Sequence, residues 1–151
     1  MIIQNFKYSR EELDLKQKDI AEMFGVHFTT VSGWETGKDT IPIERLVDYA
    51  NRFHYSLDYL FGIAKHNEDY LPLTLDLDVI AKNLRYIRKK NNLTQDQLAK
   101  KMNTTQASYS HYENATNMIP TVFLYNLTKI YKPFSIDGLL GRKKLKKKLM
   151  I

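Results

Sequence analysis

One pattern of residues occurs twice in this chain, and this repeat constrains the fold more than any other feature. When residues 93–113 are shifted back by about 78 positions, they superpose on residues 15–35, and identities continue on both sides. The identical pairs include Arg10 and Arg88, Leu15 and Leu93, Gln17 and Gln95, Ala21 and Ala99, Ser32 and Ser110, Glu35 and Glu113, and Leu46 and Leu124. The pattern predicts an internal duplication, with domains at 1–62 and 78–141, a linker at 63–77 and a basic tail at 142–151.

The second copy predicts two short helices joined by a tight turn. Thr94 is a good N-cap, and Gln97 completes a capping box three residues later. Asn103 tolerates the left-handed conformation that ends a helix. Thr105 can cap a second helix whose inner positions are Tyr109 and Tyr112. Its outward positions are small or polar, which suits insertion into the major groove of DNA.

This pattern resembles the helix-turn-helix of the phage Cro and repressor family, also called the XRE family. The resemblance covers nearly all of the chain except the linker and the tail. It implies an all-α fold of two tandem five-helix Cro/repressor-like DNA-binding domains. It also implies an internal ion pair between the first and third helices of each repeat, Arg10 with Glu35 and Arg88 with Glu113, which we assign to structure.

The resemblance places the base-reading residues of the second repeat at the start of its third helix. Gln106 is the best single candidate, because an amide can pair bidentately with N6 and N7 of adenine. Gln95 corresponds to the family glutamine that bonds a phosphate and supports the recognition helix. For His111, a solvated surface position and a DNA contact are equally compatible with the sequence. The DNA-binding candidates here are Gln95, Thr105, Gln106, Ala107, Ser108, His111 and Asn117.

The first repeat departs from this pattern. Lys16 replaces the Thr94 cap, a loss of about 1 kcal/mol, although it could meet a phosphate at the helix N-terminus. Phe28 stands where the family has a polar base-reading residue, and Gly33 replaces a side chain on the expected outward face. Phe28 could pack on a thymine methyl group or form an apolar patch for a protein partner. The candidates here are Lys16, Gln17, His27, Phe28, Thr29, Thr30 and Lys38.

Charge is distributed unevenly between the repeats. Residues 1–70 contain 8 Lys and Arg against 12 Asp and Glu, roughly −4, and residues 71–151 contain 15 against 5, roughly +10. Neutralisation of phosphates is the sequence-independent part of DNA affinity. The second repeat is therefore electrostatically prepared for DNA.

Two connections carry further expectations. Fully extended, the 15-residue linker could span roughly 50 Å, more than the 34 Å or so between half-sites on one face of DNA. Its leucines favour packing against a repeat, which shortens that reach. The turn after the second recognition helix has Ala115 in place of a glycine, so we expect Asn114 or Asn117 to supply the turn.

The sequence offers no catalytic site. It has no cysteine, no Gly-rich phosphate loop, no nucleophile elbow and no His/Glu metal spacing on one helix. We therefore expect no enzyme activity, no metal and no cofactor. No apolar run approaches the roughly 18 residues of a membrane span, and the first residues lack the order of a signal peptide, so a cytoplasmic protein is expected.

These observations favour a sequence-specific regulator, a repressor of phage or mobile-element type, whose partner is a double-stranded DNA operator. The alternative is an adaptor in which the acidic first repeat binds a protein and only the second binds DNA, or an inhibitor that uses both repeats for protein contacts. Homodimer formation also stays open.

Overall fold

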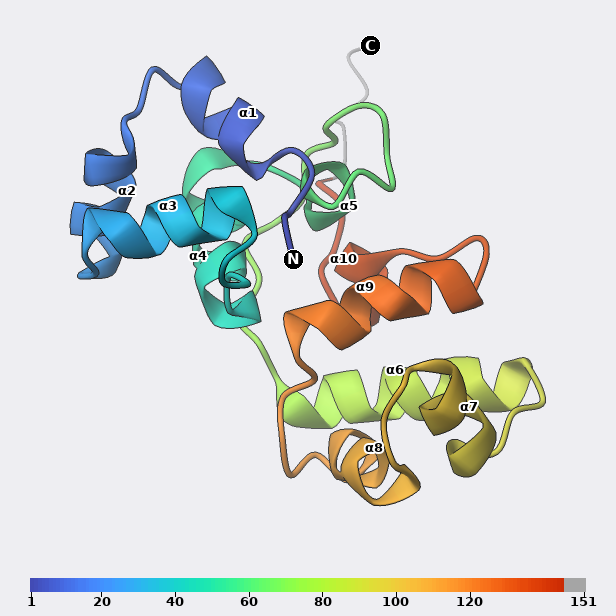
Figure 1. Ribbon diagram of the computed structural model, residues 1–151. Helices are drawn as coiled ribbons and strands as arrows, with labels where there is room; N and C mark the ends of the chain where they lie inside the picture. Colours follow the sequence, from blue (N-terminus) through green and yellow to red (C-terminus); the bar gives the residue numbers. More distant parts are fainter. Residues whose placement is uncertain (146–151) are drawn as a thin grey trace, which may run out of the picture. The chain divides into compact units, whose positions relative to one another are not determined.

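Over residues 1–145 the chain forms two compact units of five short helices each (Figure 1). The computed structural model describes residues 1–145, and every regular element in that range is a helix. The first unit comprises Met1–Asp69, and the second begins at Tyr70. The expectation of an all-α fold with two tandem helix-turn-helix domains is confirmed.

The helices of the first unit are α1 (Phe6–Glu12), α2 (Gln17–Phe24), α3 (Phe28–Thr36), α4 (Ile43–Phe53) and α5 (Leu57–Leu60). Apolar side chains from all five meet in one core, which includes Phe6, Ile20, Trp34, Leu46 and Leu60. α2 packs directly against α3. This packing fixes the direction in which α3 points its outer side chains.

The helices of the second unit are α6 (Leu77–Lys90), α7 (Gln95–Lys101), α8 (Gln106–Glu113), α9 (Thr121–Ile130) and α10 (Ile136–Leu139). Its core includes Leu84, Leu98, Tyr109, Leu124 and Ile136, none more than 1 % exposed. α8 packs against both α6 and α7. The predicted inner positions of α8 are therefore confirmed as core.

Helix ends follow the expected local chemistry in most places. Thr94 accepts the backbone N–H of Gln97 at 3.1 Å, and the Gln97 side chain accepts the N–H of Thr94 at 2.9 Å, which completes the capping box. The turns after α2 and α7 use left-handed residues, Gly25 at φ +63° and Asn103 at φ +59°. These two residue types reach that conformation at low cost.

The turn after α8 differs from the expectation. Neither Asn114 nor Asn117 takes the left-handed conformation, and Ala115 does, at φ +59°. The corresponding residue after α3, Gly37, has φ +86°. The duplicated backbone keeps the same turn in both units, so the residue at that position must adopt it whatever its side chain.

The expected ion pairs are confirmed. Arg10 donates to both carboxylate oxygens of Glu35 at 2.6 and 2.8 Å, and Arg88 donates to those of Glu113 at 2.7 and 3.0 Å. Each arginine also donates to a carbonyl in the turn that follows the first helix, at Leu15 or Leu93. Each pair thus joins the first helix, the turn and the third helix of its unit.

The segment predicted as a linker is largely attached to its neighbours. Asn67 donates to the carbonyl of His54 and accepts from the backbone N–H of Ser56 in the first unit. In the second unit Leu71 N–H bonds the Lys143 carbonyl at 2.8 Å, and Leu73 is buried. Leu73 thus packs as expected, whereas Leu71 is exposed. Residues 146–151 of the predicted basic tail lie outside the described residues.

Candidate nucleic-acid interface

The helix-turn-helix of the second unit is built from α7, the turn at Asn103 and α8. The N–H of Thr104 bonds the Ala99 carbonyl at 2.9 Å, which closes the turn against α7. Thr105 caps α8 by accepting the N–H of Ser108 at 3.1 Å. The cap leaves α8 beginning at Gln106, with its first side chains directed away from the core.

The predicted base-reading residues of the second unit share one property, which is exposure. They are Thr105, Gln106, Ala107, Ser108 and His111. Asn117, in the loop after α8, is exposed too, and Gln95 is half-buried. The structure therefore brings the candidates of α8 together on one accessible helix and places Gln95 beside them. Because these side chains are exposed, protein atoms do not block them from reaching the edges of base pairs.

Gln106 is held by a second glutamine. Its side-chain amide donates to Oε1 of Gln95 at 3.0 Å, which links the first residues of α7 and α8. Both helix N-termini carry free N–H groups that favour an anion. The amide pair therefore connects a position suited to a phosphate with a position suited to a base edge.

The carboxylate of Glu113 closes α8 in the interior, where its side chain is fully buried. Burial raises the pKa of Glu113. The hydrogen bonds from Arg88, together with weaker contacts, lower it by more. The pKa of Glu113 therefore lies below the ordinary value of 4.5. Arg85 approaches the same carboxylate at 3.8 Å and donates to the Glu113 carbonyl at 3.2 Å. Sequence reasoning missed Arg85, because no local pattern relates it to α8.

In the first unit, Phe28 stands at the position of Gln106. Its side chain is 52 % exposed and its ring centroid lies 4.6 Å from that of His27. His27 caps α3 by accepting the N–H of Thr29 at 3.3 Å through Nδ1, so part of its polar surface is already used. Thr29 is exposed and Thr30 is half-buried. The start of α3 therefore exposes the aromatic rings of His27 and Phe28, whereas the start of α8 exposes the amide of Gln106.

The expectation that Gly33 lies on an open outward face is wrong. Gly33 is buried, and a Cβ there would lie 3.0 Å from Oδ2 of Asp39. The loop after α3 returns over the helix, with the Asp39 N–H on the Gly33 carbonyl at 3.1 Å. In the second unit the position of Asp39 is taken by Asn117. The first recognition helix thus has a carboxylate beside it where the second has a neutral amide.

The remaining DNA-binding candidates of the first unit are Gln17, whose side chain is bonded inside the unit, and the exposed Lys16 and Lys38. Gln17 donates to Oε1 of Glu35 at 3.1 Å, so its amide is already engaged in the interior network. Lys16 gives α2 no side-chain cap, as expected, and Asp19 instead accepts the Lys16 N–H at 2.7 Å. Lys16 and Lys38 are exposed. These two cations are the candidates of the first unit with charge suited to phosphate.

The fold and the exposed, capped α8 define a class, that of tandem helix-turn-helix proteins. A comparison with protein-family models matches the helix-turn-helix family at residues 6–60 and again at residues 84–139, most of the chain. The chain therefore belongs to the helix-turn-helix family, of the XRE type, and is a DNA-binding transcription regulator of that type. Neither curated proteins nor solved structures gave a significant match.

Within residues 1–145 no group of three or more His, Cys, Asp or Glu side chains could hold a metal ion. No helix in that range has the length and apolar character needed to cross a bilayer.

Proposed function

We propose that the protein is a sequence-specific repressor that binds a double-stranded DNA operator mainly through α8 of its second unit. In this proposal Gln106 pairs with an adenine edge and Gln95 holds a phosphate. The observation that carries the proposal is the Gln106–Gln95 amide pair at the exposed, capped start of α8. Thr105, Ala107, Ser108 and His111 tune the readout, and Asn117 contributes from the following loop.

Charge supports a larger role for the second unit than for the first. The second half of the chain carries roughly +10 and the first roughly −4, and the phosphate contribution to affinity scales with the cations supplied. Asp39 beside α3 repels a phosphate backbone, whereas Asn117 in the matching place does not. The first unit then adds weaker contacts, through Lys16, Thr29, Thr30 and Lys38.

A repressor of phage or mobile-element type acts by occupying DNA that a polymerase needs, so its operator is expected in the region upstream of its own gene. Footprinting the protein on that region tests this directly. A footprint of one major-groove segment indicates that α8 alone engages. A footprint over two segments about one helical turn apart indicates that both units engage.

The sharp test of base readout is Gln106→Ala. Loss of a bidentate amide–adenine contact costs about 1–3 kcal/mol, so operator affinity falls roughly 10-fold to 150-fold while affinity for random duplex stays unchanged. Thr74→Ala, a change of an exposed polar side chain in the segment before α6, serves as the control and leaves both affinities alone. Equal weakening on operator and random duplex refutes readout by Gln106.

The adaptor alternative has one observation in its favour, the exposed His27–Phe28 pair on the acidic unit. Exposed aromatic side chains in a cluster are typical of protein-binding surfaces. Phe28→Ser separates the two functions. Loss of operator affinity places Phe28 on DNA, and unchanged operator affinity with loss of a co-purifying partner places it on a protein.

A further inference from the structure

The second unit has an apolar groove between α6 and α10, with a volume of about 300 Å³. Its lining includes Asn83, Tyr86, Ile87, Lys90, Phe134 and Leu139. Asn83 braces the groove by donating from Nδ2 to the Leu139 carbonyl at 2.9 Å. Ligand pockets in proteins span roughly 300–1,000 Å³, so this groove has room for one or two bulky side chains of a partner. We call it the α6/α10 groove.

The α6/α10 groove lies on the side of α6 that faces away from α8. Its α6 residues share one helix face, because they recur at spacings of three and four: Asn83, Tyr86, Ile87 and Lys90. With 3.6 residues per turn, Arg85 and Arg88 lie on the opposite face of α6, where both contact Glu113 of α8. A partner in the groove is therefore separated from α8 by the width of α6.

Three lysines surround Tyr86 on the surface of α6. Lys82 precedes Tyr86 by four residues, and Lys89 and Lys90 follow it by three and four, spacings that make side chains neighbours on a helix. All three lysines are exposed, and none has an ion-pair partner within residues 1–145. Tyr86 itself is 68 % exposed. The rim of the groove is therefore aromatic and positively charged.

Carboxylates of the second unit do not neutralise this rim. Asp78, the nearest carboxylate on α6, lies more than two turns before Tyr86. Asp137 of α10 is fully buried, and its Oδ1 accepts from Arg142 at 3.1 Å. Among the described residues, none that lines the groove carries a carboxylate. The groove thus joins an apolar floor to a positive rim.

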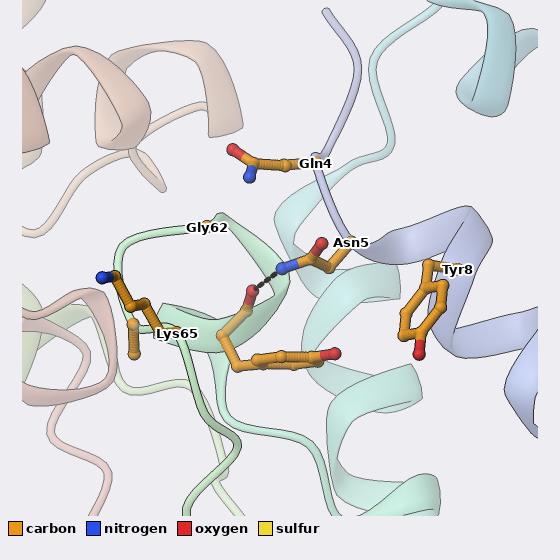
Figure 2. Close-up of a pocket in the computed structure, with 7 residues that line it drawn as sticks. Gln4, Asn5, Tyr8, Gly62 and Lys65 are labelled. Carbon is orange, nitrogen blue, oxygen red and sulfur yellow. Dashed lines mark hydrogen bonds between the residues drawn. The ribbon is translucent and has the colours of Figure 1, made fainter.

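The first unit has a groove in the matching place, between α1 and α5, but its lining is polar. Figure 2 shows Asn5, whose Nδ2 donates to the Tyr59 carbonyl at 2.7 Å and so acts as Asn83 does in the second unit. Tyr8 stands at the position of Tyr86 and is 58 % exposed. The lining of this α1/α5 groove includes Gln4, Asn5, Tyr8, Tyr59 and Lys65.

Two replacements separate the α1/α5 groove from the α6/α10 groove. Ser9 takes the place of Ile87, and its buried hydroxyl bonds the Tyr49 hydroxyl at 2.6 Å. Glu11 and Glu12 take the places of Lys89 and Lys90 on the surface of the first helix. Because the two units share one fold, the aliphatic floor and the lysine rim belong to the sequence of the second unit and are not required by the fold.

We propose that the α6/α10 groove docks an acidic segment of a protein partner. A phenylalanine or leucine of that segment packs on Ile87, Phe134 and Leu139, and its carboxylates face the lysines around Tyr86. A DNA backbone supplies phosphates for the lysines but no bulky apolar group for the floor, whereas an acidic peptide supplies both. Tyrosine is also enriched among the residues that dominate protein interfaces. The proposal does not depend on base readout by Gln106, because the groove lies on the far side of α6 from α8.

A defined peptide tests the proposal on the full chain without DNA. The probe is a fluorescein-labelled peptide of sequence EDDFLDDE, and anisotropy measures its binding. Saturable binding that weakens with added salt is expected. Lys90→Glu and Tyr86→Ala are each expected to weaken it at least about fivefold. Both side chains are exposed, so circular dichroism of the two variants should match wild type.

The first unit supplies matched controls. Lys65→Glu makes the same charge change as Lys90→Glu, and Tyr8→Ala makes the same truncation as Tyr86→Ala, but both lie at the α1/α5 groove. Both variants, and Gln106→Ala, are expected to keep wild-type affinity for the peptide. A second peptide, EDDSSDDE, keeps the charge and lacks the apolar pair, so it is expected to bind at least about tenfold more weakly.

Four results would overturn the proposal. The first is a wild-type chain that shows no saturable binding of EDDFLDDE. The second is equal affinity for EDDSSDDE, since charge alone would then explain binding. The third is an equal loss in the matched control variants, which would place the peptide on another surface. The fourth is tighter binding of oligothymidine than of the peptide, lost in Lys90→Glu and Tyr86→Ala, which would assign the groove to nucleic acid.

Discussion

The side-chain amide of Gln106 donates to Oε1 of Gln95 at 3.0 Å, so the first residues of the two helices of the motif form one polar unit. We expect Gln95→Ala and Gln106→Ala each to weaken operator binding. The two effects are also expected to be non-additive by about 1 kcal/mol, because each glutamine orients the other. Fluorescence anisotropy on labelled operator with the four variants of the cycle measures this. Additive effects would show that the pair does not act on DNA as a unit.

The buried Arg88–Glu113 pair is expected to dominate the stability of the second unit. Glu113→Gln leaves the Arg88 guanidinium without its charge partner and destabilises this unit by about 3–5 kcal/mol. Circular dichroism follows the melting, and Trp34 fluorescence reports the first unit separately, because Trp34 is the single tryptophan. The comparison variant is Asp96→Asn, which breaks the exposed Asp96–Lys100 pair and costs no more than about 1 kcal/mol.

Acid should unfold the second unit through the same carboxylate. The pKa of Glu113 in the folded unit is below its ordinary value of 4.5, so its contribution to stability is complete above that pH. The contribution disappears as pH falls through the lowered pKa. Melting temperature measured from neutral to acidic pH should therefore drop below about pH 4.5. An equally steep drop in Glu113→Gln would assign the acid sensitivity to other groups.

The left-handed Ala115 offers a simple stabilising change. Ala115→Gly removes the cost of a Cβ at positive φ and is expected to stabilise the second unit by about 1 kcal/mol. The same substitution in a helix, Ala107→Gly in α8, acts in the opposite direction by up to about 1 kcal/mol. Thermal melts of the two variants measure whether their melting temperatures shift in opposite directions. A lower melting temperature for Ala115→Gly would contradict the left-handed assignment.

Much of this architecture follows from local signals in the sequence. Thr94 and Gln97 predict the start of α7, and Gly25 and Asn103 predict the ends of the preceding helices, because each acts within one turn of backbone. The resemblance to the Cro and repressor family, at positions where Arg10 and Glu35 recur as Arg88 and Glu113, implies the inner ion pairs. The all-α fold follows from the resemblance to the Cro and repressor family, and the exposure of Gln106 follows from the cap at Thr105 and the inner positions of Tyr109 and Tyr112.

The features that sequence reasoning missed depend on contacts distant in the chain or on an inherited backbone. Spacing along the helix predicts an outward position for Gly33, but Asp39 folds over it from the next loop. Ala115 is left-handed because the turn is shared with Gly37, against its own preference. The Gln17 amide is engaged by Glu35, which lies on another helix. None of these has a local sequence pattern.

Hydrogen bonds between the segment before α6 and the segment after α10 determine which boundaries a stable fragment of the second unit can have. Arg142 donates through Nε to the Leu71 carbonyl at 2.9 Å and through Nη1 to buried Asp137 at 3.1 Å, while Tyr70 bridges to Lys144. A fragment that starts at α6 would remove an acceptor from a guanidinium that is itself buried. A version for separate expression must therefore begin no later than Tyr70 and retain Lys144, although both positions lie outside every helix.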